Sequence, residues 1–133
     1  MNRYKSLMLF AVSALGLILA ACAASPVSGP TLTEQDAGHT VEVRPGGLLD
    51  VTLDGNPTTG YQWEVDSVDS AVLKQVGEPT FKADSTAVGS GGKVTLHFQG
   101  IAAGQTTLKL IYHRSFEKNV PPAKTFEVTV TVK

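Results

Sequence analysis

The stretch Lys124-Thr-Phe-Glu-Val-Thr-Val-Thr-Val-Lys133 decides the fold class, because apolar and polar residues alternate strictly along it. Phe126, Val128, Val130 and Val132 occupy every second position, which is the period of a β-strand with one buried face. A helix would scatter these four side chains around its axis. The stretch therefore predicts a half-buried strand near the end of the chain.

The same period recurs upstream, from residue 39 onward. Apolar residues alternate in five further segments, at positions 41–43, 49–53, 61–65, 94–98 and 106–112. In the last segment Leu108, Leu110 and Tyr112 share one face while Ile111 takes the other, which is typical of a strand covered on both sides near one end. No stretch shows convincing helical periodicity, so the pattern predicts an all-β domain.

Segments rich in Gly, Pro, Asn and Asp separate the strands, at positions 44–47, 54–60, 88–92, 100–104 and 118–122. About seven strands in roughly 100 residues, with a turn every 8 to 12, is typical of an immunoglobulin-like β-sandwich. We expect two sheets with a shared core of Trp63, Phe98, Leu110 and Phe126, and a five-stranded barrel is the alternative. The single Cys cannot form an intramolecular disulfide, so an apolar core must stabilise the domain.

Composition and charge limit the number of domains and the classes of function that the sequence allows. The chain has 133 residues, 42% hydrophobic and 17% charged, which fits one globular domain and a short extra segment. Without Arg3 and Lys5, nine of the 11 basic residues remain against 12 acidic ones, and this net charge of −3 argues against nucleic-acid binding.

Catalytic and metal-binding patterns are also missing from the sequence. The three histidines, His39, His97 and His113, show no metal-ligand spacing, and no serine lies in a G-x-S-x-G motif. We therefore expect neither an enzyme nor a metal, cofactor or small-molecule site, and we expect a monomer.

The N-terminus has the pattern of a secretory signal. Residues 1–21 begin with Arg3 and Lys5 and continue with an apolar run from Leu7 to Ala21. This run has 15 residues, fewer than the roughly 20 that cross a bilayer as a helix, so a lasting transmembrane helix is the weaker interpretation.

The run ends in Leu19-Ala-Ala-Cys22, which resembles the lipobox of bacterial lipoproteins. The resemblance implies cleavage before Cys22 and lipidation of that residue, and several acyl chains would hold the protein on a membrane stably. The alternative is a buried free Cys beside an ordinary cleavage site. Residues 22–33 are rich in small residues and are expected to form a tether to the folded domain, 34–133. Ala23 stands where inner-membrane lipoproteins carry Asp, so we expect the outer membrane of a bacterial envelope, facing the periplasm or the exterior.

The segment Asn56-Pro57-Thr58-Thr59-Gly60-Tyr61 combines a fixed proline φ, two hydroxyls and a permissive glycine directly before a strand. This composition predicts a rigid loop, although an ordinary inter-strand turn would have similar residues. Trp63, in phase with Tyr61 and Val65, is expected in the core.

Three motifs together resemble the signature loops of the chagasin-type inhibitors of papain-family cysteine peptidases. They are Asn56 to Tyr61, then Gly89-Ser90-Gly91-Gly92, then Arg114-Ser115-Phe116, in the family's order. The first matches N-P-T-T-G-[FY] at every position and the second matches G-x-G-G. The third departs from the usual R-P-W, because Ser115 and Phe116 replace Pro and Trp.

The resemblance implies an immunoglobulin-like sandwich whose three loops occlude the cleft of a papain-family peptidase reversibly. It places Thr58 near the catalytic residues, the glycine-rich loop along the cleft wall, and Arg114 and Phe116 against the other side. A structural or adhesive surface lipoprotein with the same fold, but without inhibitory activity, is the alternative.

Overall fold

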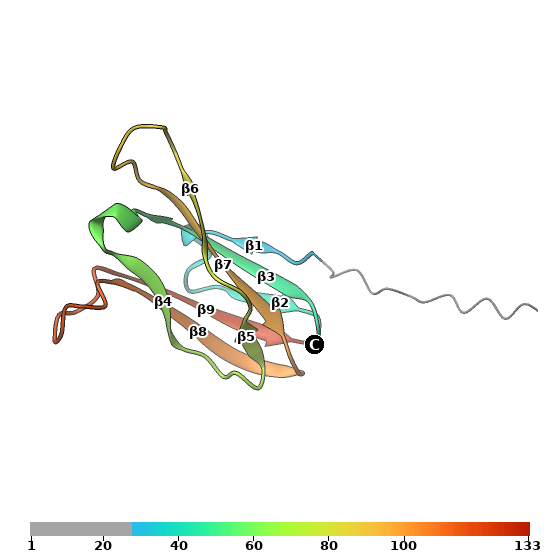
Figure 1. The fold of residues 1–133 in the computed structure, drawn as a ribbon. Helices are drawn as coiled ribbons and strands as arrows, with labels where there is room; N and C mark the ends of the chain where they lie inside the picture. The colour runs from blue at the N-terminus through green and yellow to red at the C-terminus, as the bar shows by residue number, and fades with distance from the viewer. Residues whose placement is uncertain (1–27) are drawn as a thin grey trace, which may run out of the picture.

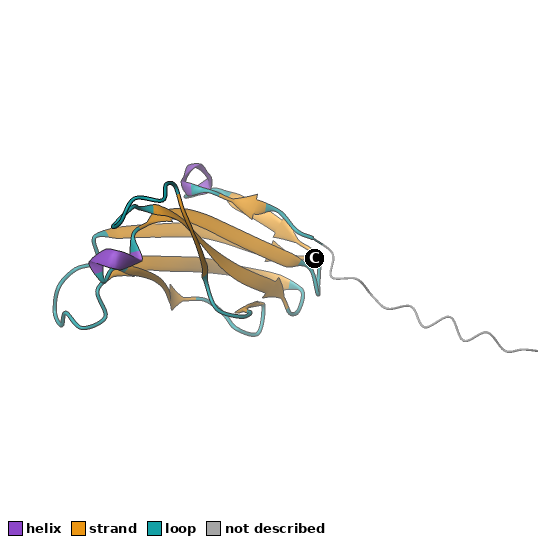
Figure 2. Cartoon of the chain, turned by 45° about the horizontal axis from the view of Figure 1, so that its top comes forward, coloured by secondary structure: helices purple, strands orange, loops and turns teal. Residues whose placement is uncertain are grey.

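The computed structural model describes residues 28–133, so the predicted signal segment 1–21 and Cys22 lie outside the described residues. Two β-sheets pack face to face, and two single turns of 3₁₀-helix interrupt the strands (Figures 1 and 2). The described elements are β1 (Thr31–Leu32), η1 (Glu34–Asp36), β2 (Thr40–Val43), β3 (Leu48–Gly55), η2 (Pro57–Thr59), β4 (Gln62–Ser67), β5 (Leu73–Gln75), β6 (Thr80–Ala83), β7 (Gly92–Gly100), β8 (Gly104–His113) and β9 (Lys124–Val132).

One sheet has the order β1-β3-β7-β5, with β6 also paired to β7, and the other has the order β2-β9-β8-β4. Strands β1 and β2 run parallel to β3 and β9, respectively, and the other pairings are antiparallel. The all-β, two-sheet prediction is confirmed, and the five-stranded barrel is excluded.

The core lies between the two sheets, where the alternating residues of the long strands meet. Phe126 of β9 is 2% exposed, and Phe98 of β7 and Leu110 of β8 are fully buried. Trp63 of β4 is 4% exposed, so the predicted core residues are all confirmed. Apolar burial of this kind is the main favourable term in folding.

The sequence pattern missed three short strands, β1, β5 and β6, so residues 28–133 form nine strands where six alternating segments were identified and about seven strands were expected. β1 and β5 have two and three residues, which are too few to show a period, and all four residues of β6 are exposed, so β6 has no buried face to alternate. β1 also corrects the tether prediction for residues 22–33: Thr31 and Leu32 pair with Asp50 and Val51 of β3, and Leu32 is 5% exposed.

The two ends of the sandwich differ. β3, β6 and β8 run toward one end, where the three motif segments lie, and the C-terminus lies at the other end (Figure 1). The first described residues also lie at the C-terminal end, since the N–H of Asp50 donates to Pro30 O at 3.1 Å and that of Lys133 donates to Val43 O at 3.0 Å. Within residues 28–133 we find no helix with the length and apolar character needed to cross a bilayer.

Candidate functional site

Three loops gather at the end of the sandwich opposite the C-terminus (Figures 1 and 2). We call residues 56–61, between β3 and β4, the first loop; residues 84–91, between β6 and β7, the second loop; and residues 114–123, between β8 and β9, the third loop. The three predicted motifs fall on these loops, except for Gly92, which begins β7, and the hydrogen bonds described next join the loops.

The first loop is closed by its own hydrogen bonds. Asn56 caps η2, because its Oδ1 accepts a bond from the Thr58 N–H at 3.1 Å, and the Thr59 hydroxyl donates to Asn56 O at 2.6 Å. Gly60 ends the turn with φ 81°, a left-handed conformation that favours glycine. The predicted rigid loop thus has a physical basis, and Pro57 and Thr58 are left exposed at its tip.

Asn56 connects the first loop to its neighbours. Its N–H donates to the Tyr112 hydroxyl of β8 at 2.8 Å, and its Nδ2 donates to Gly89 O of the second loop at 3.0 Å. The backbone N–H, the side-chain nitrogen and, through its bond with Thr58, the side-chain oxygen of Asn56 are all used inside the molecule, which fits a role in positioning two loops together.

Aromatic rings support the first loop from below. The ring centres of Tyr61 and Tyr112 are 5.2 Å apart, and those of Tyr112 and Trp63 are 5.0 Å apart. The Trp63 indole N–H donates to Asp54 O at 2.9 Å, so its one polar atom is paired. Because Trp63 and Tyr112 are buried in the core, stacking on them restricts the position of Tyr61 and so of the first loop.

Arg114 joins the third loop to the first. Its Nε donates to Thr59 O at 3.0 Å, its guanidinium carbon lies 4.4 Å from the centre of the Tyr61 ring, and a terminal nitrogen donates to Glu117 at 2.9 Å. The hydrogen bond with Glu117 raises the pKa of Arg114, which keeps it charged. The resemblance implied that Arg114 contacts the peptidase, but here the guanidinium is engaged inside the molecule.

Phe116 is the exposed aromatic of the third loop, with 70% of its surface accessible. One edge of its ring faces Gly60, where a built Cβ would lie only 3.1 Å from the ring. Ser115 is exposed, and the Glu117 N–H donates to Arg114 O at 3.1 Å, which closes a tight turn around Ser115 and Phe116 without a proline.

The glycines of the second motif have different surroundings. Gly89 has φ 77° and lies in the second loop, but Gly92 is already the first residue of β7 and is buried. A Cβ at Gly92 would lie 2.1 Å from Lys82 O, so the close approach of β6 already requires a glycine there. Ser90 and Gly91 are half-buried.

Sequence reasoning missed two exposed apolar residues at this end. Val88 of the second loop is fully exposed, and Val120 of the third loop is 55% exposed. Their only sequence signal is a large apolar residue inside a turn-rich segment.

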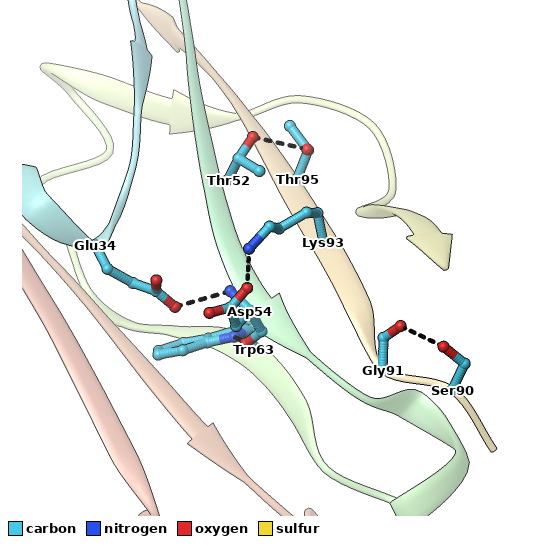
Figure 3. A network of polar contacts seen from close by, with 8 residues as sticks. All are labelled: Glu34, Thr52, Asp54, Trp63, Ser90, Gly91, Lys93 and Thr95. Atoms are coloured by element: carbon cyan, nitrogen blue, oxygen red, sulfur yellow. Dashed lines mark hydrogen bonds and ion pairs between the residues drawn. The ribbon is translucent and has the colours of Figure 1, made fainter. Parts of the chain in front are cut away.

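A polar network holds the bases of the first and second loops (Figure 3). The Asp54 N–H donates to Glu34 Oε1 at 2.8 Å, and the Asp54 carboxylate pairs with Lys93 at the start of β7. The hydrogen bond from Lys93 lowers the pKa of Asp54, and the same bond raises the pKa of Lys93. Glu34 belongs to η1, so the segment just after β1 helps to shape the loop end.

Two of the three histidines form cross-strand pairs with carboxylates. His97 Nδ1 lies 2.7 Å from Asp50 Oδ1, and His113 Nε2 lies 2.7 Å from Glu64 Oε2. His97 is half-buried. In the part of the chain that the structure describes, no three His, Cys, Asp or Glu residues come together as a metal site.

Three hydrogen-bonded loops at one end of a β-sandwich define a binding module. A family model described as "Chagasin family peptidase inhibitor I42" matches residues 42–130, and the chain belongs to this family. Among curated relatives, Amoebiasin-1 of Entamoeba histolytica is 34% identical over 106 residues, 77% of this chain and 99% of that protein. Chagasin of Trypanosoma cruzi is 31% identical over 87 residues, 62% of this chain and 79% of that protein.

Solved structures show the same fold. The cysteine protease inhibitor EhICP2 of Entamoeba histolytica superimposes with a TM-score of 0.68 at 27% identity, covering 79% of this chain and all of that one. The Leishmania mexicana ICP gives a TM-score of 0.54 at 31% identity, covering 74% of this chain and 89% of that one. The immunoglobulin-like sandwich is therefore confirmed.

Proposed function

We propose that this chagasin-family inhibitor blocks papain-like cysteine peptidases by filling their active-site cleft with its three loops. The chain is an inhibitor and not an enzyme, as its family shows, and its partner is a papain-family peptidase. In the proposed complex Thr58, at the exposed tip of the first loop, approaches the catalytic residues of the peptidase. No scissile bond is offered there, so inhibition is reversible occlusion.

One observation supports the three-loop wedge most strongly. The first loop is bonded to the second through Asn56 and Gly89, and to the third through Thr59 and Arg114, before any partner arrives. Ordering a flexible side chain on binding costs about 0.5–1.5 kcal/mol, so loops already held together retain more of the contact energy as affinity. A protease–inhibitor interface buries roughly 800 Å² per partner, which a surface of three loops can supply.

In the proposed complex the second and third loops contact opposite walls of the peptidase cleft. Phe116 offers an exposed ring for stacking on a peptidase aromatic, while the second loop brings backbone near Gly89 and the exposed Val88 to the other wall. The family favours inhibition over the structural or adhesive alternative, which has no support from the relatives.

Titration of papain with residues 23–133, with chymotrypsin as a control, tests the proposal. Thr58→Arg should raise the inhibition constant (Ki) for papain at least 100-fold, because a long charged side chain would meet the cleft floor, with no change in the circular dichroism spectrum. Thr107→Arg, at an exposed position of β8 away from the loops, is the matched control and should leave Ki unchanged. An unaltered Ki for Thr58→Arg would rule out the first loop as the occluding element.

We also propose that Cys22 anchors the inhibitor to the outer membrane of a bacterial cell. The geometry supports this, because the first described residues lie at the end of the sandwich opposite the three loops. An anchor at that end would leave the loops pointing away from the membrane and accessible to a peptidase.

A further inference from the structure

We propose that the peptidase interface continues from the loops onto the side of the sandwich, where a pocket between β4 and β6 receives an apolar side chain from the rim of the peptidase cleft. This inference rests on the proposed function and extends the same binding surface. It assigns a role to Phe81, which lies outside the three family motifs.

The pocket has a volume of about 230 Å³, enough for one large apolar side chain. Most of its lining is apolar and comes from the first loop, β4, the segment before β6, β6 itself and β7: Pro57, Tyr61, Trp63, Pro79, Phe81 and Val94. An apolar pocket open to water gains free energy when an apolar group fills it, at about 25 cal/mol per Å² of surface buried.

The two sheets leave this side of the sandwich open. Among the described strands, β6 pairs only with β7, and β4 pairs only with β8. All four residues of β6 are exposed, and Phe81 keeps 40% of its surface accessible. An exposed aromatic beside an apolar pocket is typical of a protein-binding surface.

Continuity with the loops identifies the occupant as the peptidase. Pro57 and Tyr61 belong to the first loop and also line the pocket, and Phe81 pairs with Val94, two residues from the start of β7. A peptidase seated on the first loop would therefore have its cleft rim beside Phe81. The loop end also carries most of the large apolar residues that are exposed in residues 28–133: Val88 is in the second loop, and Phe116 and Val120 are in the third.

The chain's own N-terminal segment does not reach the pocket if it begins at Cys22. Five residues lie between Cys22 and Ser28, and the six steps of chain span about 20 Å at most. Ser28 lies beside the start of β3, on the β1 side of the sheet. The pocket includes Val94, which pairs with Leu53 about 17 Å further along β3, and Phe81 of β6, which is three strand spacings of about 4.8 Å from β1. The two offsets combine to about 22 Å even in a straight line through the sheet. A second copy of the chain is the remaining occupant, and the test distinguishes it.

Phe81→Ala in residues 23–133 tests the inference. We expect Ki for papain to rise roughly tenfold, chiefly through faster dissociation, as for the loss of a buried aromatic contact. Phe81→Leu should stay within about threefold of the wild type, because Leu still fills apolar space. Ile101→Ala is the matched control, since Ile101 is exposed to a similar degree, 45%, in the connection between β7 and β8 at the opposite end, and its Ki should not change.

Hydroxyl-radical footprinting supplies a second measurement that does not depend on the variants. Phe81 should be protected in the papain complex and Ile101 should not. Suppose that the wild type inhibits papain, that Thr58→Arg abolishes inhibition, that Phe81→Ala leaves it unchanged and that Phe81 is unprotected. This result would overturn the inference and leave the proposed function standing. No papain inhibition by the wild type would overturn both. Protection of Phe81 without papain, with a dimer in sedimentation, would assign the pocket to a second copy and also overturn the inference.

Discussion

Arg114 is the residue that holds the third loop in place where chagasin-type inhibitors usually continue with a proline. A proline would restrict the backbone directly. Here a turn bond between Arg114 and Glu117, together with the bond from Arg114 to Thr59 O, restrains the same segment. The cation–π contact with Tyr61 adds a third restraint.

Arg114→Ala should therefore raise Ki for papain by about tenfold to 100-fold, because the first and third loops lose their common joint and must be ordered on binding. The association rate should fall as well, which separates loop positioning from the loss of a simple contact. Lys118→Ala, an exposed charge on the same loop, is the control and should have little effect. Stopped-flow measurement of association and dissociation rates checks both, and unchanged rates for Arg114→Ala would contradict the role as a joint.

Asp54 makes a pH-dependent contribution to stability. Its pKa is lowered in the folded protein by the hydrogen bond from Lys93, so the folded state favours the carboxylate. That contribution is present above the unfolded pKa of about 3.9 and is lost as the pH falls through the lower folded value. The pair is half exposed, which makes the contribution small.

Asp54→Asn should lower the melting temperature by a few degrees at pH 7, and the difference from the wild type should shrink as the pH falls below about 3.9. Added salt should also reduce the difference, since screening weakens an exposed pair. Scanning calorimetry from pH 2 to 8 checks this, and a difference that is the same at pH 2 as at pH 7 would show that the ion pair is not its cause.

At the scale of elements, β1 and η1 belong to the inhibitor domain. Leu32 is buried against β3, and Glu34 two residues later accepts a bond from Asp54 directly before the first loop. The N-terminal segment is thus connected to the loop end by packing and by one hydrogen bond, although its sequence looks like the end of a tether.

Leu32→Ala should lower the free energy of unfolding by about 2–3 kcal/mol, because it removes buried apolar volume. Thr31→Ala, at the exposed neighbouring position of the same strand, should change it by less than about 0.5 kcal/mol. Urea denaturation of the two variants measures the difference. Equal stabilities would show that β1 is not part of the cooperative unit.

At the scale of the whole molecule, the sandwich separates its two ends by function. The loops lie at one end, and the chain enters from the other, where the proposed lipid anchor would be attached. With the proposed anchor in place, the length of the β-sandwich would hold the three loops away from the bilayer.

Cys22→Ser in the full chain should move the protein from the membrane fraction to the soluble fraction of bacterial cells, because the acylated thiol is the proposed anchor. Papain inhibition by the released protein should be unchanged, since Cys22 is far from the loops along the chain. Ser25→Ala is the control and should leave the protein on the membrane. Persistence of the Cys22→Ser protein in the membrane fraction would contradict a lipid anchor.

Alternation along β9, β3 and β8 determined the fold class by itself, because a strand with one buried face must repeat every two residues. The three motifs likewise determined the family and marked the segments from Asn56 to Tyr61, Gly89 to Gly92 and Arg114 to Phe116. These features are local in the chain, so the sequence alone is sufficient to show them.

Only the tertiary structure decided which residues of the three motifs make contacts within the protein and which are exposed. Asn56 and Arg114 form hydrogen bonds that join the loops, and Gly92 allows the close approach of β6. Phe116, by contrast, is exposed. The pocket beside Phe81 and the pairing of β1 also depend on strands far apart in the chain. No local pattern encodes such contacts, because they arise only when packing of the core brings distant segments to one place.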